Sequence, residues 1–356
     1  MRLLYVKNGN STFIRLDEEI LRRNFRTRVI SLNNRGRVVY FLHLLKLILL
    51  LAIRMPFTPV AFTRFADWHS AIMAFFCRLF GKRMVLVVGG YDASFLPEFG
   101  YGVYSRKTRG KWAKYALRNA RLILPNNPSL VSNRNKYLPG IIRNGGIDFF
   151  VPHRKGSVRV LYNGYRTDFW VPATSPKKPG LVITVAYVDN IRTYRIKGLN
   201  DFIGAARQLP DLEFRLIGSG QEQLLTWEGE LPANLAVMNA LEPEVLLQHY
   251  QEAKVFCLLS LTEGMSNVLC EAMLCECVPV VSDVNFNAGL VGDSGFVVAQ
   301  RDPSLIVEAI RKASEAAHDH GKKARKRIAE NFSLERREKE LVDSVRACYG
   351  VLKPSR

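Results

Sequence analysis

Two glutamates, Glu263 and Glu271, lie in the segment SLTEGMSNVLCEAM, residues 260–273. The segment follows an apolar run typical of a strand, and its small polar residues open a predicted helix. The unpaired N–H groups at the start of a helix bind anions, and Gly264 lets the backbone approach a bound group closely. A carboxylate at Glu271, one to two turns into the helix, can accept hydrogen bonds from a vicinal diol such as that of ribose. The spacing therefore predicts a site for a nucleotide that carries a second polyol.

A basic segment, RTYRIKG at residues 192–198, contains cations that could balance a diphosphate. Lys197, next to Gly198, can place its ammonium group on phosphate oxygens, while Arg192 or Arg195 can bind them bidentately. A basic loop without a ligand is the alternative interpretation of this segment.

Two glycine-containing turns could also bring the backbone close to a ligand. Gly218, Ser219 and Gly220 follow a predicted strand and could contact a base or a phosphate. Gly9 lies in the loop KNGNST, residues 7–12, between the first predicted strand and the first predicted helix. Ordinary turn chemistry explains both segments equally well, so neither is specific by itself.

The composition indicates a folded protein with more than one domain. A length of 356 residues suggests two domains. Hydrophobic residues make up 48% and charged residues 23%, which excludes an intrinsically disordered chain. Six cysteines without a C-x-x-C pair exclude a disulfide scaffold and a zinc ribbon, and favour reduced cysteines in a cytosolic protein.

The positive charge is concentrated in one half of the chain. The net charge is +19; residues 1–178 hold 31 Lys and Arg against 8 Asp and Glu, whereas residues 179–356 hold 20 against 24. Such a field attracts anions, so nucleic acid, an anionic membrane and a phosphorylated substrate are all candidates. The densest stretch interleaves cations with aromatic residues, which suits nucleic acid or phospholipid headgroups: Arg106, Lys107, Arg109, Lys111, Lys114 and Arg118 with Tyr101, Tyr104, Trp112 and Tyr115.

Strands and helices are predicted to alternate along both halves, which indicates parallel sheets covered by helices. In the first half we expect strands at 2–7, 28–32, 58–64, 84–88 and 122–125, and helices at 13–23, 38–53, 69–80 and 109–119. In the second half we expect strands at 180–186, 213–217, 235–238, 255–259 and 278–281, and helices at 199–208, 243–252, 268–275, 303–317 and 333–349. Residues 171–180, VPATSPKKPG, read as a linker because three prolines and a glycine fall within ten residues.

The most membrane-like segment, residues 38–53, favours a buried helix of an α/β domain. Its sixteen residues include His43 and Lys46, and they are fewer than the roughly 20 apolar residues of a spanning helix. A helix lying in a membrane interface is the alternative.

The ordered set of motifs resembles the signature of family-four retaining glycosyltransferases. The glutamates lie in EGMSNVLCEAM and are followed by VPVVS at 278–282 and GDSGF at 292–296. Lys197-Gly198, the Gly218–Gly220 turn and Asn163-Gly164 precede them in the family's order. The resemblance covers residues 155–332 well and the first half loosely. It implies the GT-B fold, an α/β architecture of two Rossmann-like doubly wound domains facing across a cleft.

The resemblance also implies roles for individual residues. Glu263 would contact the hydroxyls of the donor sugar, and Lys197 with Arg192 or Arg195 would neutralise the departing diphosphate. Glu271 would hold the nucleotide ribose. The family needs no metal or other cofactor beyond the UDP- or GDP-sugar donor. The donor-binding residues implied are Gly9, Gly218, Ser219, Gly220, Gly264, Met265, Ser266, Asn267, Val268 and Glu271.

Two positions depart from the family's pattern. Many members carry a histidine just before Gly-x-Asp, where this chain has Gly89 followed by Gly90, Tyr91 and Asp92, the residues expected on the acceptor side. His69, after the preceding strand, is a candidate replacement for that catalytic histidine. Tyr187 stands where an arginine is expected after the phosphate-binding strand, which leaves Arg192 and Arg195 to compete for its role.

The sequence therefore predicts residues 1–170 as an acceptor and membrane domain and 171–332 as a nucleotide-sugar domain. A helix in 333–356 would pack back on the first domain. The predicted function is retaining transfer of a hexose to a lipid-linked glycan in surface polysaccharide or lipopolysaccharide biosynthesis. We expect a cytoplasmic enzyme, peripheral on the inner face of the cytoplasmic membrane, that does not bind nucleic acid. The alternative is a GT-B protein with other chemistry, such as a nucleotide-sugar epimerase or an inactive donor-binding protein.

Overall fold

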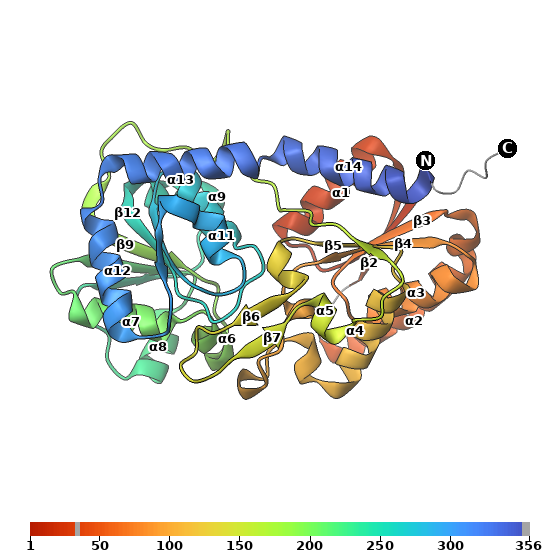
Figure 1. The fold of residues 1–356 in the computed structure, drawn as a ribbon, viewed down its shortest axis with the longest axis horizontal. Helices are drawn as coiled ribbons and strands as arrows, with labels where there is room; N and C mark the ends of the chain where they lie inside the picture. Colours follow the sequence, from red (N-terminus) through yellow and green to blue (C-terminus); the bar gives the residue numbers. More distant parts are fainter. Residues whose placement is uncertain (33–35, 351–356) are drawn as a thin grey trace. The chain divides into compact units, whose positions relative to one another are not determined.

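The computed structural model describes residues 1–32 and 36–350, which form two compact units (Figure 1). Unit 1 contains Met1–Asn133, Asn144–Asn163 and the chain from Glu335 on. Unit 2 contains Arg134–Arg143 and Gly164–Leu334. The sequence analysis placed the domain boundaries at 170/171 and 332/333; part of its last segment, 351–356, lies outside the described residues.

Unit 1 is built on a parallel sheet in the order β2-β1-β3-β4-β5-β8, with Leu4 of β1 opposite Arg28 on one side and Ala61 on the other. Its strands are β1 (Arg2–Asn8), β2 (Arg26–Leu32), β3 (Val60–Arg64), β4 (Arg83–Val88), β5 (Leu122–Pro125) and β8 (Ser157–Val158). Its helices are α1 (Thr12–Asn24), α2 (Arg37–Arg54), α3 (Trp68–Leu79), α4 (Lys107–Asn119), α5 (Ile147–Phe150) and α14 (Leu334–Gly350). Two short strands, β6 (Asn133–Asn135) and β7 (Arg143–Gly145), pair separately.

Unit 2 is built on a second parallel sheet in the order β11-β10-β9-β12-β13-β14, which counted within the unit is the 3-2-1-4-5-6 order of a Rossmann fold. Its strands are β9 (Lys178–Val185), β10 (Glu213–Ile217), β11 (Leu235–Met238), β12 (Ala253–Leu258), β13 (Val278–Ser282) and β14 (Phe296–Val298). Its helices are α6 (Ile191–Ile196), α7 (Leu199–Gln208), α8 (Gln221–Glu228), α9 (Pro243–Glu252), α10 (Asn267–Leu274), α11 (Asn287–Val291), α12 (Pro303–Glu315) and α13 (His318–Asn331).

The observed elements confirm the predicted alternation of strands and helices, with three differences. The linker is shorter than predicted, because Lys178–Gly180 already belong to β9. The basic segment read as a loop forms the short helix α6. The sequence analysis also missed several short elements and one longer helix, namely α5, α8, α11, α13, β6, β7, β8 and β14.

A buried charge network fastens the last helix to unit 1. Asp17 of α1 accepts hydrogen bonds from Arg337 of α14, at 2.7 and 3.1 Å, and forms a second ion pair with Arg64 at the end of β3. All three side chains are at most 2% exposed. Arg337 also donates to the carbonyl oxygen of Tyr162 at 2.6 Å. Removing one member would leave uncompensated charge in the interior, so this network fixes where α14 packs.

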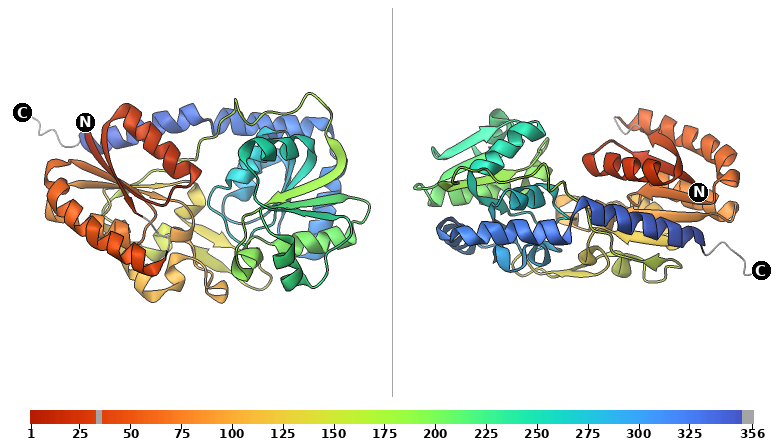
Figure 2. Two further views of the ribbon diagram at one scale, coloured as in Figure 1. Left: turned by 180° about the vertical axis from the view of Figure 1, so that it is seen from behind. Right: turned by 90° about the horizontal axis from the view of Figure 1, so that it is seen from above.

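The helix α2 is not the buried helix that the sequence favoured. Leu44, Leu47 and Leu51 pack in the core of unit 1, but only 22% of its most apolar window is buried. The apolar stretch, Val38–Phe57, spans 20 residues with a mean hydropathy of 2.1, which is long and apolar enough to cross a membrane by length and composition. Figure 2 shows α2 lying along the outside of the sheet of unit 1. The sequence argument failed because a helix that is apolar all round carries no periodicity to mark its exposed side.

Replacing Asp17 by alanine is expected to lower the free energy of unfolding by about 3–5 kcal/mol, because two buried guanidinium groups lose their counter-charge. Arg22→Ala on the same helix removes only an exposed i,i+4 ion pair with Glu18 and should cost about 0.3–0.5 kcal/mol. Urea denaturation of both variants measures the difference. Equal losses would show that the buried network does not hold α14 in place.

Candidate functional site

Lys197 and Glu263, two of the predicted site residues, form an ion pair at the carboxyl edge of the sheet of unit 2. Lys197 Nζ lies 2.7 Å from Glu263 Oε1, and the glutamate side chain is 10% exposed against 32% for the lysine. Lys197 follows β9 through α6, while Glu263 follows β12, and these two strands are neighbours at which the strand order reverses. Ligands of open α/β sheets bind at such a switch point. The topology thus brings together two residues that are 66 positions apart in the chain.

Close approach of two backbone segments positions Lys197. Gly198 has φ of +64°, and a Cβ atom there would overlap the carbonyl oxygen of Leu259. Next to this contact, the N–H of Leu261 donates to the carbonyl oxygen of Ile196 at 2.8 Å. Only glycine combines this conformation with this proximity, so the Lys-Gly pair sets the lysine directly against the loop that carries Glu263.

Asn285, which the sequence analysis missed, holds the loop of Glu263. Its side-chain oxygen accepts from the N–H of Glu263 at 2.9 Å and from the hydroxyl of Thr262 at 3.0 Å. Asn285 itself has φ of +52°, a left-handed conformation that asparagine tolerates better than most residues. Asparagine after a strand is common turn chemistry, and nothing in the sequence connects it with a glutamate 22 positions earlier.

The start of α10 follows Glu263 and contains the predicted donor-binding residues Gly264, Met265, Ser266, Asn267 and Val268. Ser266 is the N-cap residue, and its side chain makes no capping hydrogen bond to the helix. Asn267 accepts a hydrogen bond from the Tyr165 hydroxyl at 3.2 Å. The backbone N–H groups of this first turn therefore receive no side-chain cap from Ser266, and they carry the partial positive charge of a helix start.

Glu271 lies further along α10 and is mostly buried. Desolvation by burial raises the pKa of its carboxyl group from 4.5 to about 7. A half-ionised, poorly solvated carboxylate is a strong acceptor for a pair of hydroxyl groups that replaces its lost water.

The glycine turn after β10 is tightly packed. Gly218 has φ of +108°, and a Cβ atom there would overlap the carbonyl oxygen of Ala186. The N–H groups of Gly218 and Ser219 both donate to the carbonyl oxygen of Met238, at 2.9 and 3.2 Å. The buried Ser219 hydroxyl has no hydrogen-bond partner in the described part of the chain, and Gly220 is the N-cap residue of α8. Two of the backbone donors expected to meet a ligand are therefore engaged within the protein, and the Ser219 hydroxyl is the polar group left over.

Arg192 and Arg195 remain equal candidates for binding phosphate. Both lie on α6, three positions apart, and so point to one side of the helix. Both are exposed, and neither forms an ion pair with a described residue. Tyr187, which replaces the expected arginine, is 73% exposed.

In unit 1, Asp92 organises the turn after β4. Its carboxylate accepts hydrogen bonds from the N–H groups of Gly89, Gly90 and Ala66, each at 3.0 Å. Burial raises the pKa of Asp92 against the opposing effect of these hydrogen bonds. The side chain therefore supports the backbone of the predicted acceptor segment and does not project from it. Tyr91, in the same segment, packs edge to face against Tyr101 with ring centroids 5.1 Å apart.

The space that a side chain at position 89 would take is filled by Phe65. A Cβ atom at Gly89 would lie 2.5 Å from the Phe65 ring. Phe65 has φ of +67°, an uncommon conformation for an aromatic residue. This chain therefore lacks the histidine that many members of the resembled family carry at position 89, and the Phe65 ring occupies the space that its side chain would need.

His69 does not replace that histidine. Its ring is fully buried; Nε2 lies 2.9 Å from the carbonyl oxygen of Arg64 and Nδ1 lies 3.4 Å from the Tyr40 hydroxyl. Burial lowers its pKa, which favours the neutral ring. Because both ring nitrogens are engaged inside unit 1, His69 does not offer a free nitrogen for the predicted catalytic role.

Gly9, a predicted donor-binding residue, lies in unit 1 with φ of +90°, and its N–H donates to the carbonyl oxygen of Leu32 at 3.5 Å.

Comparison with known proteins shows a family for part of the chain. Residues 174–332 match the family model described as glycosyl transferases group 1. This segment is a group 1 glycosyltransferase domain. It contains the paired strands β9 and β12 with Lys197 and Glu263. No curated protein sequence matches the chain significantly.

Solved structures show that the whole chain has the GT-B fold, as predicted. A sucrose-phosphate synthase of Thermosynechococcus elongatus aligns with a TM-score of 0.76 at 16% identity, over 99% of this chain and all of that one. The Anabaena protein HepE in complex with UDP and glucose aligns with a TM-score of 0.73 at 14% identity, over 98% and 100%. A UDP-forming α,α-trehalose-phosphate synthase of Burkholderia xenovorans, in complex with glucose-6-phosphate, gives 0.67 at 14%, over 97% and 100%.

Two glycines of the glycosyltransferase domain should respond oppositely to alanine. Gly198→Ala should lower the free energy of unfolding by about 1–2 kcal/mol or more, because the left-handed conformation is strained and Cβ meets Leu259. At Gly204, within α7, a Cβ atom would enter open space, with no atom of a described neighbour within 4 Å, so Gly204→Ala should raise it by about 0.5–1 kcal/mol. Urea denaturation distinguishes them. A neutral Gly198→Ala would mean that the two segments do not approach closely.

Proposed function

We propose that the protein is a retaining glycosyltransferase that transfers a hexose from a nucleotide-diphosphate sugar to a lipid-linked glycan, in the biosynthesis of a cell-surface polysaccharide. The observation that carries this proposal is the ion pair of Lys197 and Glu263 at the switch point of unit 2, beside the start of α10. A cation, a carboxylate and the positively polarised start of a helix at one sheet edge suit a diphosphate with a sugar attached.

The pair explains how the donor would be held. When the ammonium group of Lys197 pairs with the diphosphate, it no longer pairs with Glu263. The carboxylate of Glu263 can then accept hydrogen bonds from sugar hydroxyls. Arg192 or Arg195 adds a second positive charge, and Glu271 accepts from the ribose diol. Charge that develops on the departing phosphate is then stabilised by groups already in place.

The reaction proceeds on one face of the donor sugar. The acceptor hydroxyl oxygen forms a bond to the anomeric carbon on the side from which the phosphate leaves. The bond between that carbon and the phosphate oxygen breaks, and the departing phosphate takes the acceptor's proton. Attack and departure on one face retain the anomeric configuration. Here the protein's cations stabilise the leaving group, so the reaction requires no metal.

A UDP-sugar is the first donor to test. The structural relatives include HepE bound to UDP-glucose and a UDP-forming synthase. GDP-sugars are the second choice, because only a few residues would contact the base and they do not distinguish uracil from guanine.

Within the residues that the structure describes, no three His, Cys, Asp or Glu side chains are grouped so as to hold a metal ion.

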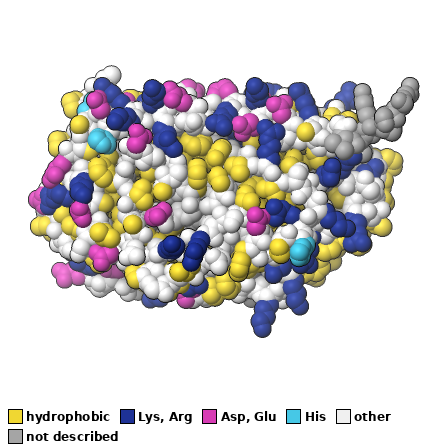
Figure 3. All heavy atoms as spheres, in the orientation of Figure 1, with side chains coloured by type: hydrophobic (Ala, Val, Ile, Leu, Met, Phe, Trp, Pro, Cys, Tyr) yellow, Lys and Arg dark blue, Asp and Glu magenta, His cyan; other side chains and the backbone are white. Residues whose placement is uncertain are grey.

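The proposed place of action is the inner face of the cytoplasmic membrane. The first half of the chain is strongly basic, and the face drawn in Figure 3 shows many Lys and Arg over unit 1. The exposed apolar side of α2 adds a surface that can enter the headgroup region. Positive charge with exposed apolar side chains is the combination that binds anionic membranes.

A GT-B protein with other chemistry, an epimerase or an inactive donor-binding protein, is the second candidate. It is favoured by the turn at Gly89, where Phe65 leaves no room for a histidine and His69 is buried. Such a protein would bind a nucleotide sugar without transferring the hexose.

Lys197→Ala is expected to lower the rate of UDP-glucose or GDP-mannose turnover, in the presence of EDTA, by about 100-fold. The readout is release of the nucleoside diphosphate, with NMR of the first-formed sugar reporting its anomeric configuration. A product formed with inversion would contradict the retaining mechanism.

Arg311→Ala is the matched control, because Arg311 forms an exposed ion pair with Asp211 elsewhere in unit 2. Its turnover should stay within about twofold of the wild-type rate. Equal effects of the two substitutions would remove Lys197 from the phosphate site. Binding of a nucleotide sugar without any turnover would favour the second candidate.

A further inference from the structure

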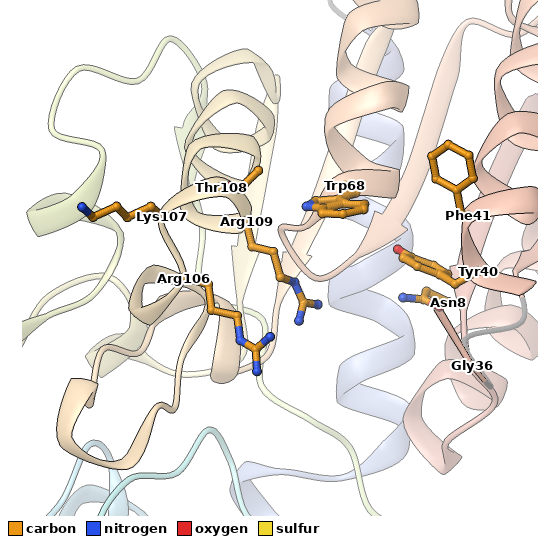
Figure 4. Close-up of a pocket in the computed structure, with 9 residues that line it drawn as sticks. All are labelled: Asn8, Gly36, Tyr40, Phe41, Trp68, Arg106, Lys107, Thr108 and Arg109. Carbon is orange, nitrogen blue, oxygen red and sulfur yellow. The ribbon is translucent and has the colours of Figure 1, made fainter. Parts of the chain in front are cut away.

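Unit 1 contains a pocket of about 810 Å³ at its own switch point (Figure 4). Asn8 ends β1 and Trp68 begins α3 after β3, and β1 and β3 are the strands at which the order of this sheet reverses. The start of α2 and the start of α4 form the other walls. The lining residues are Asn8, Gly36, Tyr40, Phe41, Trp68, Arg106, Lys107, Thr108 and Arg109.

One wall of the pocket is cationic. Arg106 and Lys107 are exposed, and neither forms an ion pair with a described residue. Arg109 is fixed by Asp67, with Nε 3.1 Å from Oδ1 and a second ion-pair contact to Oδ2. Figure 4 shows the guanidinium groups of Arg106 and Arg109 near each other, whereas the Lys107 side chain points away from them. Two neighbouring guanidinium groups favour a phosphate, whose oxygens can accept from both, over a lone carboxylate.

The opposite wall is formed by aromatic residues, among them Trp68 and Tyr40. The Trp68 indole Nε1 and the Asn8 side-chain oxygen are buried and have no hydrogen-bond partner among the residues that the structure describes. Figure 4 shows the indole nitrogen on the side of Trp68 that faces Arg109, with the Tyr40 hydroxyl directed to the same space. A buried donor without a partner costs about 1–3 kcal/mol, which a polar ligand atom would recover.

The pocket opens onto an apolar surface. Phe41 lines the pocket and is 55% exposed. It belongs to the exposed side of α2 and the 3-10 turn after it, which includes Val38, Leu42, Leu45, Leu49, Ile53 and Phe57, and two exposed residues of α3, Phe75 and Leu79. The cations Lys46 and Arg78 lie on the same two helices and are exposed. Several apolar side chains in water next to a phosphate-type pocket suit a ligand with an apolar tail.

We propose that this pocket binds the phosphate-bearing headgroup of a lipid and that the lipid chain lies along the exposed side of α2. Arg106 and Arg109 bind the phosphate, and Lys107 adds positive charge at the rim. Trp68 and Tyr40 contact the group attached to the phosphate, and Phe41 lies between the pocket and the lipid chain. The inference rests on the proposed function, since this lipid is the acceptor, and it names the class of that acceptor as a phosphate-linked lipid. A soluble sugar phosphate would make no contact with the apolar surface beside the pocket.

The test uses the full-length protein and three probes. These are phosphatidylcholine vesicles doped with polyprenyl phosphate, vesicles of equal charge doped with phosphatidylglycerol, and glucose 6-phosphate in solution. We expect the polyprenyl phosphate vesicles to bind most tightly. Arg106→Ala/Lys107→Ala and, separately, Phe41→Ser should each weaken that binding by about tenfold.

The matched control is Arg26→Ala/Arg28→Ala, which removes two exposed cations from β2 of the same unit. Its vesicle binding should stay close to that of the wild type. An equal loss in this control, or equal binding to phosphatidylglycerol vesicles, would reduce the interaction to general electrostatics and overturn the proposal. Tight binding of glucose 6-phosphate that Phe41→Ser leaves unchanged would also overturn it, in favour of a soluble ligand.

Release of UDP from UDP-glucose without acceptor, measured on the same variants, separates this proposal from the proposed function. Hydrolysis without selective lipid binding would contradict only the pocket. Selective lipid binding without turnover of any nucleotide sugar would contradict only the transferase activity.

Discussion

The carboxylate of Asp17 balances two buried guanidinium groups, and the arrangement of unit 1 depends on this contact. Through Arg337 it holds the last helix, 320 positions away in the chain, against α1. Through Arg64 it fixes the end of β3, where the next residue, Phe65, turns into a left-handed conformation and fills the space beside Gly89. The carbonyl oxygen of Arg64 also engages His69. One buried charge thus shapes the sheet edge at which the family carries a histidine.

In unit 2 the corresponding constraint is steric. Gly198 and Gly218 each bring a loop against the carbonyl oxygen of a neighbouring segment, where no side chain fits. The first contact sets Lys197 against Glu263 at the switch point, where strand order alone would only bring their loops near each other. In the proposed function this site exchanges its internal ion pair for a charged ligand, and rigid loops would lower the entropy lost on binding. The two glycines supply that rigidity.

Local patterns in the sequence were enough to predict the alternating elements, and the resemblance of the ordered motifs to a known family predicted the GT-B fold. The ion pair of Lys197 with Glu263 was not predicted, although both residues were assigned to one site. Three features depend on contacts that no local pattern encodes. The exposure of α2 was missed because most residues on its exposed side are apolar, as they are on its buried side. The burial of His69 depends on Tyr40 and on a backbone carbonyl from β3. Asn285 acts through a turn whose partner lies 22 positions away.

The central claim is that unit 2 binds a nucleotide sugar through Glu271, and calorimetric titration of UDP-glucose and GDP-mannose tests it most directly. A sugar-linked diphosphate does not titrate near neutral pH, so any pH dependence there belongs to the protein. Because burial raises the pKa of Glu271 to about 7, one of the two donors should bind more tightly at pH 8 than at pH 6. Glu271→Gln should remove this dependence and weaken binding at pH 8 by about tenfold. Absence of binding by either donor, or a variant that binds as the wild type does at both pH values, would contradict the account.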